Sequence, residues 1–268
     1  MKISVIISVY NAEEFVANAA KSALQFKEIC EVFLIEYGSS DYSPVICENL
    51  AETYDRVKLF RHNQGRYKEN NMPCRNLGIE NASGDFIAFL DAGSYCLPNR
   101  FDAEKELLKN KNVDGVYGAV GLHYYSQRAR DRYYHLYKDR LIPGYNKCHP
   151  KTFIPGKLNK ADLFDQFSID TLTVRRDRLL EKMDSLFTSY SMQGDLEFLL
   201  SVSHYLELYY GILHEPVAMQ GVQDHCKIFW DSDKYAVSVT EKSTTNKRLL
   251  NWLMNIETFK VFSRYSPS

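Results

Sequence analysis

The sequence predicts an α/β protein with a doubly wound, mostly parallel sheet and helices on both faces. Runs rich in β-branched residues alternate along the chain with segments of helical periodicity. The spacing of this alternation is typical of parallel strands joined by right-handed crossover helices. A chain of 268 residues is also long enough to bury a substantial core.

The first strand is expected over Ile3–Val9, where β-branched residues dominate. The helix after it carries apolar side chains on one face, namely Phe15, Val16, Ala19, Ala20, Ala23 and Leu24. Asn11 is the expected cap of this helix, and Glu14 completes the pattern of a capping box. The chain therefore opens with a strand–helix unit.

The same alternation continues to Leu90. The expected elements are, in order, a strand over Val32–Ile35, a helix capped by Ser43 and opened by Pro44, a strand over Val57–Phe60, a helix over Pro73–Ala82 and a strand over Phe86–Leu90. Ligands of such sheets bind at the carboxyl ends of the strands, at the point where the strand order reverses. If the order is 3-2-1-4, that point lies between Tyr10 and Asp91.

Beyond Pro98 the pattern is weaker. We expect a helix over Arg100–Lys109, a strand over Val113–Val120, a helix over Leu196–Tyr205 and a strand over Tyr209–Leu213. Residues 123–155 carry many tyrosines among Arg and Lys, so they either line an acceptor pocket or form a basic amphipathic helix over the sheet. Apolar residues at helical spacing over 249–259 predict a last helix that packs on its own domain or binds a membrane surface or a partner.

The balance of charge excludes some partners. With 33 Lys and Arg against 34 Asp and Glu, the net charge is -1, so no basic field attracts a nucleic acid. The apolar run at the N-terminus is too short for a signal peptide or a membrane span. The six cysteines show no short zinc-type spacing, which fits reduced thiols. We therefore expect a cytoplasmic protein without a transmembrane segment, leaving open peripheral association with the inner membrane surface.

Several segments together resemble the inverting family 2 glycosyltransferases of the GT-A fold. They are Val5–Asn11, Gly38–Asp41, Arg75–Ile79, Ala82–Asp91 and Gly194–Leu200. The resemblance covers residues 1–98 well and about 170–217 loosely. It implies a nucleotide-sugar-binding half over 1–98, an acceptor-side half over 99–217 and a C-terminal tail with an amphipathic helix over 218–268.

The resemblance also implies an activity. Members of this family move a sugar from a nucleotide-diphosphate sugar to a hydroxyl of a glycan or lipid-linked acceptor, with inversion, as in polysaccharide biosynthesis. Such chemistry needs a base on the acceptor and stabilisation of the departing diphosphate, which a divalent cation, Mn²⁺ or Mg²⁺, usually supplies. The implied roles are base contact for Ser8 and Tyr10, donor binding for Glu36, Tyr37 and Arg75, ribose or metal binding for Asp91, and general base for Asp195.

The chain departs from the family pattern at two positions. Tyr37 stands where an acid that recognises the nucleotide base is usual, and Gly93 stands where the second acid of the Asp-X-Asp motif belongs. Substitute metal ligands are Asp41, Glu215, Asp224 and His225, and Arg75 could instead neutralise the phosphates. The alternative function is that of a non-catalytic GT-A protein that binds a nucleotide, a glycan or a partner.

Overall fold

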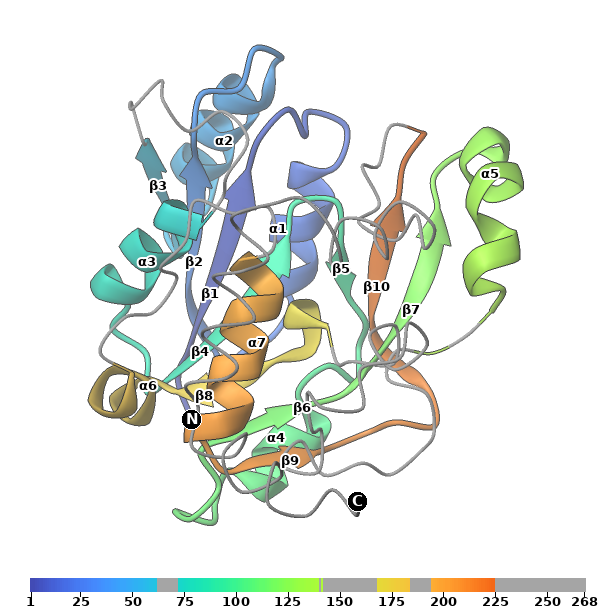
Figure 1. Ribbon diagram of the computed structural model, residues 1–268. Coiled ribbons are helices and arrows are strands. Elements are labelled where there is room, and N and C mark those ends of the chain that lie inside the picture. The colour runs from blue at the N-terminus through green and yellow to red at the C-terminus, as the bar shows by residue number, and fades with distance from the viewer. Residues whose placement is uncertain (62–71, 140, 142–167, 184–193, 225–268) are drawn as a thin grey trace, which may run out of the picture.

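The computed structural model describes residues 1–61, 72–139, 141, 168–183 and 194–224. Its large sheet has the order β3-β2-β1-β4-β8-β6-β9, which confirms the expected order 3-2-1-4 (Figure 1). The strands are β1 (Ile3–Val9), β2 (Ile29–Glu36), β3 (Val57–Arg61), β4 (Phe86–Asp91), β6 (Gly115–Tyr117), β8 (Thr173–Arg175) and β9 (Leu208–Tyr210). The first four of them in sheet order are mutually parallel, whereas β8 runs antiparallel to both of its neighbours. The predicted α/β class with a mostly parallel sheet is confirmed.

Helices cover both faces of this sheet, and each face has its own apolar core. The helices α1 (Val16–Leu24), α2 (Ser43–Thr53) and α4 (Asp102–Leu107) pack on one face. The helices α3 (Met72–Asn81), α6 (Arg176–Lys182) and α7 (Gly194–Tyr205) pack on the other. The predicted apolar face of α1 is buried from Val16 to Leu24. Among the described residues, no helix is long and apolar enough to span a bilayer.

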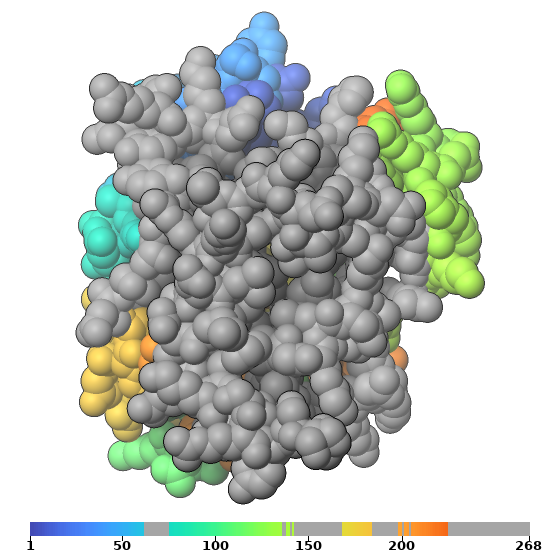
Figure 2. Space-filling model, in the orientation of Figure 1, coloured from blue at the N-terminus to red at the C-terminus, as the bar shows by residue number. Residues whose placement is uncertain are grey.

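A second, smaller sheet stands beside the large one (Figure 1). Its strands, in the order β5-β10-β7, are β5 (Tyr95–Cys96), β10 (Pro216–Val222) and β7 (Ala119–Tyr124). The helix α5 (Gln127–Tyr137) forms one flank of the molecule on this side (Figure 2). Residues 218–222 therefore belong to a sheet strand, while the helix expected over 249–259 lies outside the described residues. The division into two halves and a tail stays a prediction.

The strand expected over 113–120 is in fact two strands. β6 pairs with β8 and β9 in the large sheet, whereas β7 pairs with β10 in the small one. Gly118 lies between them, and a Cβ there would come within 2.7 Å of Val217. The apolar pattern is continuous, but the pairing partner changes at this glycine.

The two predicted helix caps are wrong, because both side chains join neighbouring loops instead. Asn11 adopts a left-handed φ of 46°, and its Oδ1 accepts a hydrogen bond from the Ser40 amide at 2.8 Å. Ser43 Oγ accepts one from the Ala12 amide at 2.8 Å. These contacts hold the loop after β1 against the loop after β2, at the edge where ligands of such sheets bind.

Candidate active site

The predicted donor-binding residues gather at the carboxyl edge of β2, β1 and β4. Ser8 on β1 pairs in register with Asp91, the last residue of β4. Glu36 ends β2, and Tyr10 and Tyr37 follow β1 and β2 directly. The strand order thus brings together residues from distant parts of the chain at the switch point.

Two tyrosine rings stack at this edge. The ring centroids of Tyr10 and Tyr37 lie 5.1 Å apart, and the ring planes differ by 17°. Both side chains are half-buried, so the pair offers a partly open aromatic surface. Such a surface suits a planar nucleotide base. Tyr37, which replaces the usual acid, is therefore part of a stacked pair.

Glu36 faces its own loop. Its carboxylate accepts hydrogen bonds from the amides of Gly38 at 2.9 Å and Ser39 at 2.5 Å, and the residue is buried. Gly38 has a φ of +93°, a conformation that favours glycine. Glu36 therefore shapes the turn after β2.

Ser8 has a buried hydroxyl whose oxygen has no hydrogen-bond partner among the described residues. Buried polar atoms in proteins are nearly always paired, so the Ser8 hydroxyl is free to pair with a ligand atom or a water molecule. In the strand register, Ser8 is the partner of Asp91 on β4.

Arg75 and Asp91 form an ion pair with an Nη2–Oδ1 distance of 2.8 Å. The Arg75 side chain is 2% exposed and that of Asp91 is 38% exposed, so the carboxylate is the accessible partner. Arg75 comes from α3, which approaches β1 closely because Gly78 has no side chain: a Cβ there would lie 2.8 Å from Ile6. The two opposite charges of this pair offset each other.

Asp170 is a site residue that the sequence analysis missed. It lies in the short helix η3 (Ile169–Thr171) and is 1% exposed. Its Oδ1 accepts from the Asp91 amide at 2.7 Å and its Oδ2 from Ser94 Oγ at 2.9 Å. Burial, and then the charge of Asp91, raise the pKa of Asp170 to about 7. The one signal in the sequence was that Asp170 is an isolated acid in the segment 168–174, whose other residues are uncharged.

Asp195, the predicted base, lies in the first turn of α7. Its side chain lies outside the described residues. Further along the same helix, the ring of Phe198 packs edge-on against Phe89, with centroids 5.4 Å apart. Phe89 precedes Asp91 by two positions on β4, so α7 lies over β4 near its carboxyl end (Figure 1).

The alternative metal ligands that lie in the described residues each have another hydrogen-bond partner. Their partners are the Ser43 amide for Asp41, Asn99 for Glu215 and Ser126 for Asp224. His225 lies outside the described residues. Within the described ranges, no group of three His, Cys, Asp or Glu side chains could hold a metal ion. Because Asp91 already pairs with Arg75, these residues do not fit the oxygen-rich donor set that Mg²⁺ or Mn²⁺ prefers.

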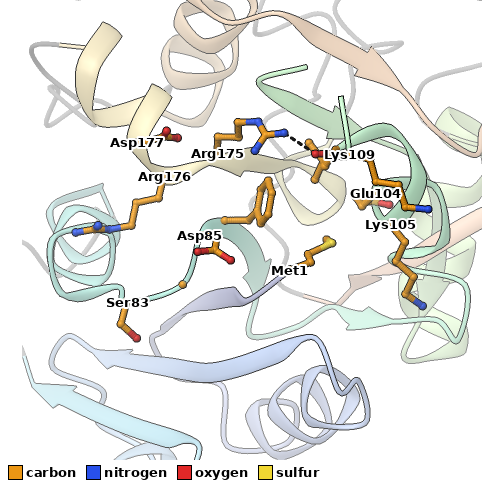
Figure 3. Close-up of a pocket in the computed structure, with 12 residues that line it drawn as sticks. Met1, Ser83, Asp85, Glu104, Lys105, Lys109, Arg175, Arg176 and Asp177 are labelled. Carbon is orange, nitrogen blue, oxygen red and sulfur yellow. Dashed lines mark hydrogen bonds between the residues drawn. The ribbon is translucent and has the colours of Figure 1, made fainter. Parts of the chain in front are cut away.

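A pocket of about 590 Å³ lies at the opposite, amino end of β4. Figure 3 shows Asp85 and Met1 between Arg176 on one side and Lys105 and Lys109 on the other. The side chains around this pocket carry both positive and negative charges. The guanidinium of Arg175 donates hydrogen bonds to the main-chain oxygens of Leu108, Val113 and Asn110. The candidate site is therefore the opposite edge, around Asp91.

Comparison with known proteins decides the family. Residues 4–183, more than half of the chain, match the family described as Glycosyl transferase family 2. The chain belongs to glycosyl transferase family 2. An uncharacterised glycosyltransferase of Haemophilus influenzae is 34% identical to this family member over 119 residues, 43% of this chain and 46% of that protein.

A second relative covers more of the chain. The GalNAc(5)-diNAcBac-PP-undecaprenol beta-1,3-glucosyltransferase of Campylobacter jejuni is 27% identical over 198 residues, 73% of this chain and 53% of that protein. This family 2 chain thus spans about half the length of each of these two relatives.

Solved structures of low sequence identity show the same fold. TarS 1–349 of S. aureus in complex with UDP-GlcNAc has a TM-score of 0.56 at 17% identity, covering 82% of this chain and 58% of that one. Glucosyl-3-phosphoglycerate synthase of Mycobacterium tuberculosis, in complex with Mn²⁺, UDP and glucosyl-3-phosphoglycerate, has a TM-score of 0.51 at 13% identity, covering 82% and 70%. The expected GT-A fold is confirmed.

Proposed function

We propose that this family 2 member transfers a sugar from a nucleotide-diphosphate sugar to a hydroxyl acceptor, with inversion. The observation that carries the proposal is the cluster at the carboxyl edge of β2, β1 and β4: a stacked tyrosine pair, the unpaired Ser8 hydroxyl and the Arg75–Asp91 pair. The complex of TarS with UDP-GlcNAc supports a nucleotide-sugar donor.

The donor would bind across the switch point. The nucleotide base stacks on the Tyr10–Tyr37 pair, and Ser8 Oγ hydrogen-bonds its polar edge. The exposed carboxylate of Asp91 accepts hydrogen bonds from the ribose hydroxyls, while Arg75 fixes the orientation of this carboxylate and offsets its negative charge near the phosphates. Glu36 contributes by holding the turn that follows Tyr37.

Asp195 is the proposed general base. Its carboxylate takes the proton of the acceptor hydroxyl while the hydroxyl oxygen forms a bond to the anomeric carbon. The bond from that carbon to the nucleoside diphosphate breaks on the opposite side, so the configuration inverts. The α7–β4 contact at Phe198 and Phe89 supports this role, because it keeps the helix that carries Asp195 close to the Asp91 edge.

The proposed acceptor is a glycan or a lipid-linked sugar, in cytoplasmic polysaccharide biosynthesis at or near the inner membrane surface. The name of the Campylobacter jejuni relative, which includes an undecaprenol-linked oligosaccharide, supports this class of acceptor. A neighbour solved with Mn²⁺ makes a divalent cation a natural candidate cofactor. The described residues do not fit such an ion, so no step here is assigned to one.

The alternative function is that of a non-catalytic member that binds a nucleotide, a glycan or a partner. Gly93 and Tyr37, which replace two family acids, favour it. The two functions differ in one result, because detectable transfer by the wild-type chain excludes the non-catalytic alternative.

The Asp195→Asn variant tests the proposed reaction. Release of nucleoside diphosphate from a panel of nucleotide sugars would be measured with an undecaprenyl-pyrophosphate-linked oligosaccharide as acceptor. Removing a general base should lower the rate by about a hundredfold or more, while donor binding by calorimetry stays unchanged. Asp102→Asn, at an exposed site on α4, is the matched control and should keep full activity. Full activity of Asp195→Asn would show that Asp195 is not the general base.

A further inference from the structure

The end of the Gln223 side chain lies beside Gly93, where the second acid of the family motif would stand. A Cβ placed on Gly93 would lie 3.1 Å from Nε2 of Gln223. Gln223 follows directly on β10, and its residue is half-buried. The amide end of this side chain therefore lies over Gly93, next to the Asp91 edge of the large sheet.

The backbone around Gly93 is held against β10. Tyr125 Oη donates a hydrogen bond to the Gly93 oxygen at 3.0 Å. A Cβ on Gly221 would lie 2.0 Å from the same oxygen, so this close approach requires glycine at position 221. Asp170 holds the other side of the loop through the Asp91 amide and the Ser94 hydroxyl. Contacts on both sides thus fix the loop next to Gln223.

The exchange of an acid for an amide changes the charge of the site. Two unpaired carboxylates beside a diphosphate would repel it unless a cation lay between them. In this chain position 93 adds no carboxylate, and Asp91 is paired with Arg75 at 2.8 Å. The other carboxylate at this loop, that of Asp170, is buried and bonded to the Asp91 amide and to Ser94. The atom of Gln223 nearest Gly93 is Nε2, whose N–H groups suit phosphate oxygens.

We propose that this chain binds the donor diphosphate without a divalent cation, and that Gln223 Nε2 donates a hydrogen bond to it in the space of the missing acid. This inference rests on the proposed function, because it assumes a nucleotide-diphosphate donor. It predicts that nucleotide affinity is the same with and without Mn²⁺, and that an acid at position 93 or 223 creates a dependence on the ion.

The first test is calorimetric titration of the full chain with UDP, GDP, dTDP and CDP, each in EDTA and in Mn²⁺. Equal affinity of one nucleotide in the two buffers is the expected result. Binding that appears only with Mn²⁺ would support the proposed function and overturn this inference. Binding of no nucleotide in either buffer would overturn both.

The Gln223→Glu variant tests the residue itself, since it keeps the length of the side chain and adds a negative charge. Loss of a hydrogen bond to a charged group should weaken nucleotide binding in EDTA by about tenfold or more, and Mn²⁺ should restore part of it. Gln25→Glu, at the exposed end of α1, makes the same change of charge away from this edge and should leave binding unchanged. Equal binding by Gln223→Glu and the wild type in EDTA would contradict the assignment of Gln223.

A second variant gives a result that needs no nucleotide. A double variant combines Gly93→Asp, which supplies the second acid of the Asp-X-Asp motif, with Gln223→Ala, which removes the side chain next to it. Titration with Mn²⁺ alone, followed by electron paramagnetic resonance, should detect a bound ion in this double variant. Gly93→Asp alone should bind it more weakly, because the Gln223 amide faces the new carboxylate. The inference would be overturned if the double variant bound no more Mn²⁺ than the wild type. It would also be overturned if the wild type bound Mn²⁺ and Asp91→Asn abolished that binding.

Discussion

Asp170 carries a carboxyl group that is costly to ionise where it stands. Burial and the neighbouring Asp91 raise its pKa from 3.8 to about 7, against the opposing hydrogen bonds from the Asp91 amide and Ser94. Between these two pH values the folded state holds its proton more tightly than the unfolded state. The contribution of this group to stability is therefore complete below about pH 4 and declines as the pH rises towards 7.

The Asp170→Asn variant should remove that decline. An asparagine oxygen can still accept from the Asp91 amide, and its NH₂ can donate to Ser94. The free energy of unfolding of the variant, relative to the wild type, should rise by roughly 2 to 4 kcal/mol between pH 4 and pH 7 and then level off. Urea unfolding at several pH values measures this difference. A difference that does not change with pH would contradict the assigned ionisation.

Glu31 behaves in the opposite sense. Burial would raise its pKa, but hydrogen bonds from Lys58, Ser4 and Ser83 outweigh it and lower the pKa from 4.5 to about 2. The distances to its carboxylate are 2.6 Å from Ser4 Oγ and 2.6 Å from the Ser83 amide. This stabilisation is complete above about pH 4.5 and is lost as the pH falls towards 2.

Glu31→Gln should therefore destabilise the fold at neutral pH and much less in acid. We expect a loss of about 2 to 3 kcal/mol at pH 7, because the variant loses a buried, charged hydrogen-bonding partner. The difference from the wild type should shrink below pH 4, as measured by chemical denaturation. Glu106→Gln, whose side chain is 72% exposed in a surface ion pair with Lys109, is the control and should change little. An equally large loss of unfolding free energy in this control would show that the effect is not specific to Glu31.

At the scale of elements, strands and helices were predicted where the local pattern and the pairing agree. β1 has the expected bounds, and α1 buries the expected face. The strand expected over 113–120 is divided, because the change of partner at Gly118 depends on β8, β9 and β10, which lie far away in the sequence. Local periodicity carries no information about which partner a strand selects.

The same limit explains which site residues could be predicted. The strand order placed the switch point between Tyr10 and Asp91, whereas Ser8 and Glu36 were named only because of the family resemblance, and their roles stay predictions. Asp170 meets Asp91 across 79 positions of the sequence, and Gln223 meets Gly93 through the small sheet. Neither contact leaves a sequence pattern, because each depends on how two segments far apart in the chain pack together.

The contact between β10 and the loop after β4 should be sensitive to one methyl group. In Gly221→Ala the new Cβ would lie 2.0 Å from the Gly93 oxygen, so the loop has to move away from Tyr125 and Gln223. We expect a loss of about 1 to 3 kcal/mol in the free energy of unfolding, together with weaker nucleotide binding.

Gly93→Ala is the matched control for that contact. Its Cβ would meet only the end of the flexible Gln223 side chain, at 3.1 Å, so its cost should be much smaller. Thermal unfolding and nucleotide titration of both variants measure the difference. Equal stability of Gly221→Ala and the wild type would show that the loop is not held against β10.

At the scale of the whole molecule, both sheets contribute to the candidate site. The large sheet supplies the donor edge through the order β3-β2-β1-β4, and the small sheet brings β10 and β7 to the loop that follows Asp91 (Figure 1). η3 packs against β4, β7 and β10, so Asp170 lies where the two sheets meet. The candidate site is therefore assembled from both sheets. This explains why its residues lie far apart in the sequence.

The central claim, that this family 2 chain binds a nucleotide-diphosphate donor at the edge around Asp91, is tested most directly by thermal unfolding with UDP, GDP, dTDP and CDP and their sugars. A ligand at a hundred times its dissociation constant adds about 2.7 kcal/mol to the stability of the folded state. We predict a clear rise in the melting temperature with one of these nucleotides, and its loss in a variant that combines Tyr10→Ala with Tyr37→Ala. No rise with any nucleotide at millimolar concentration would contradict the claim.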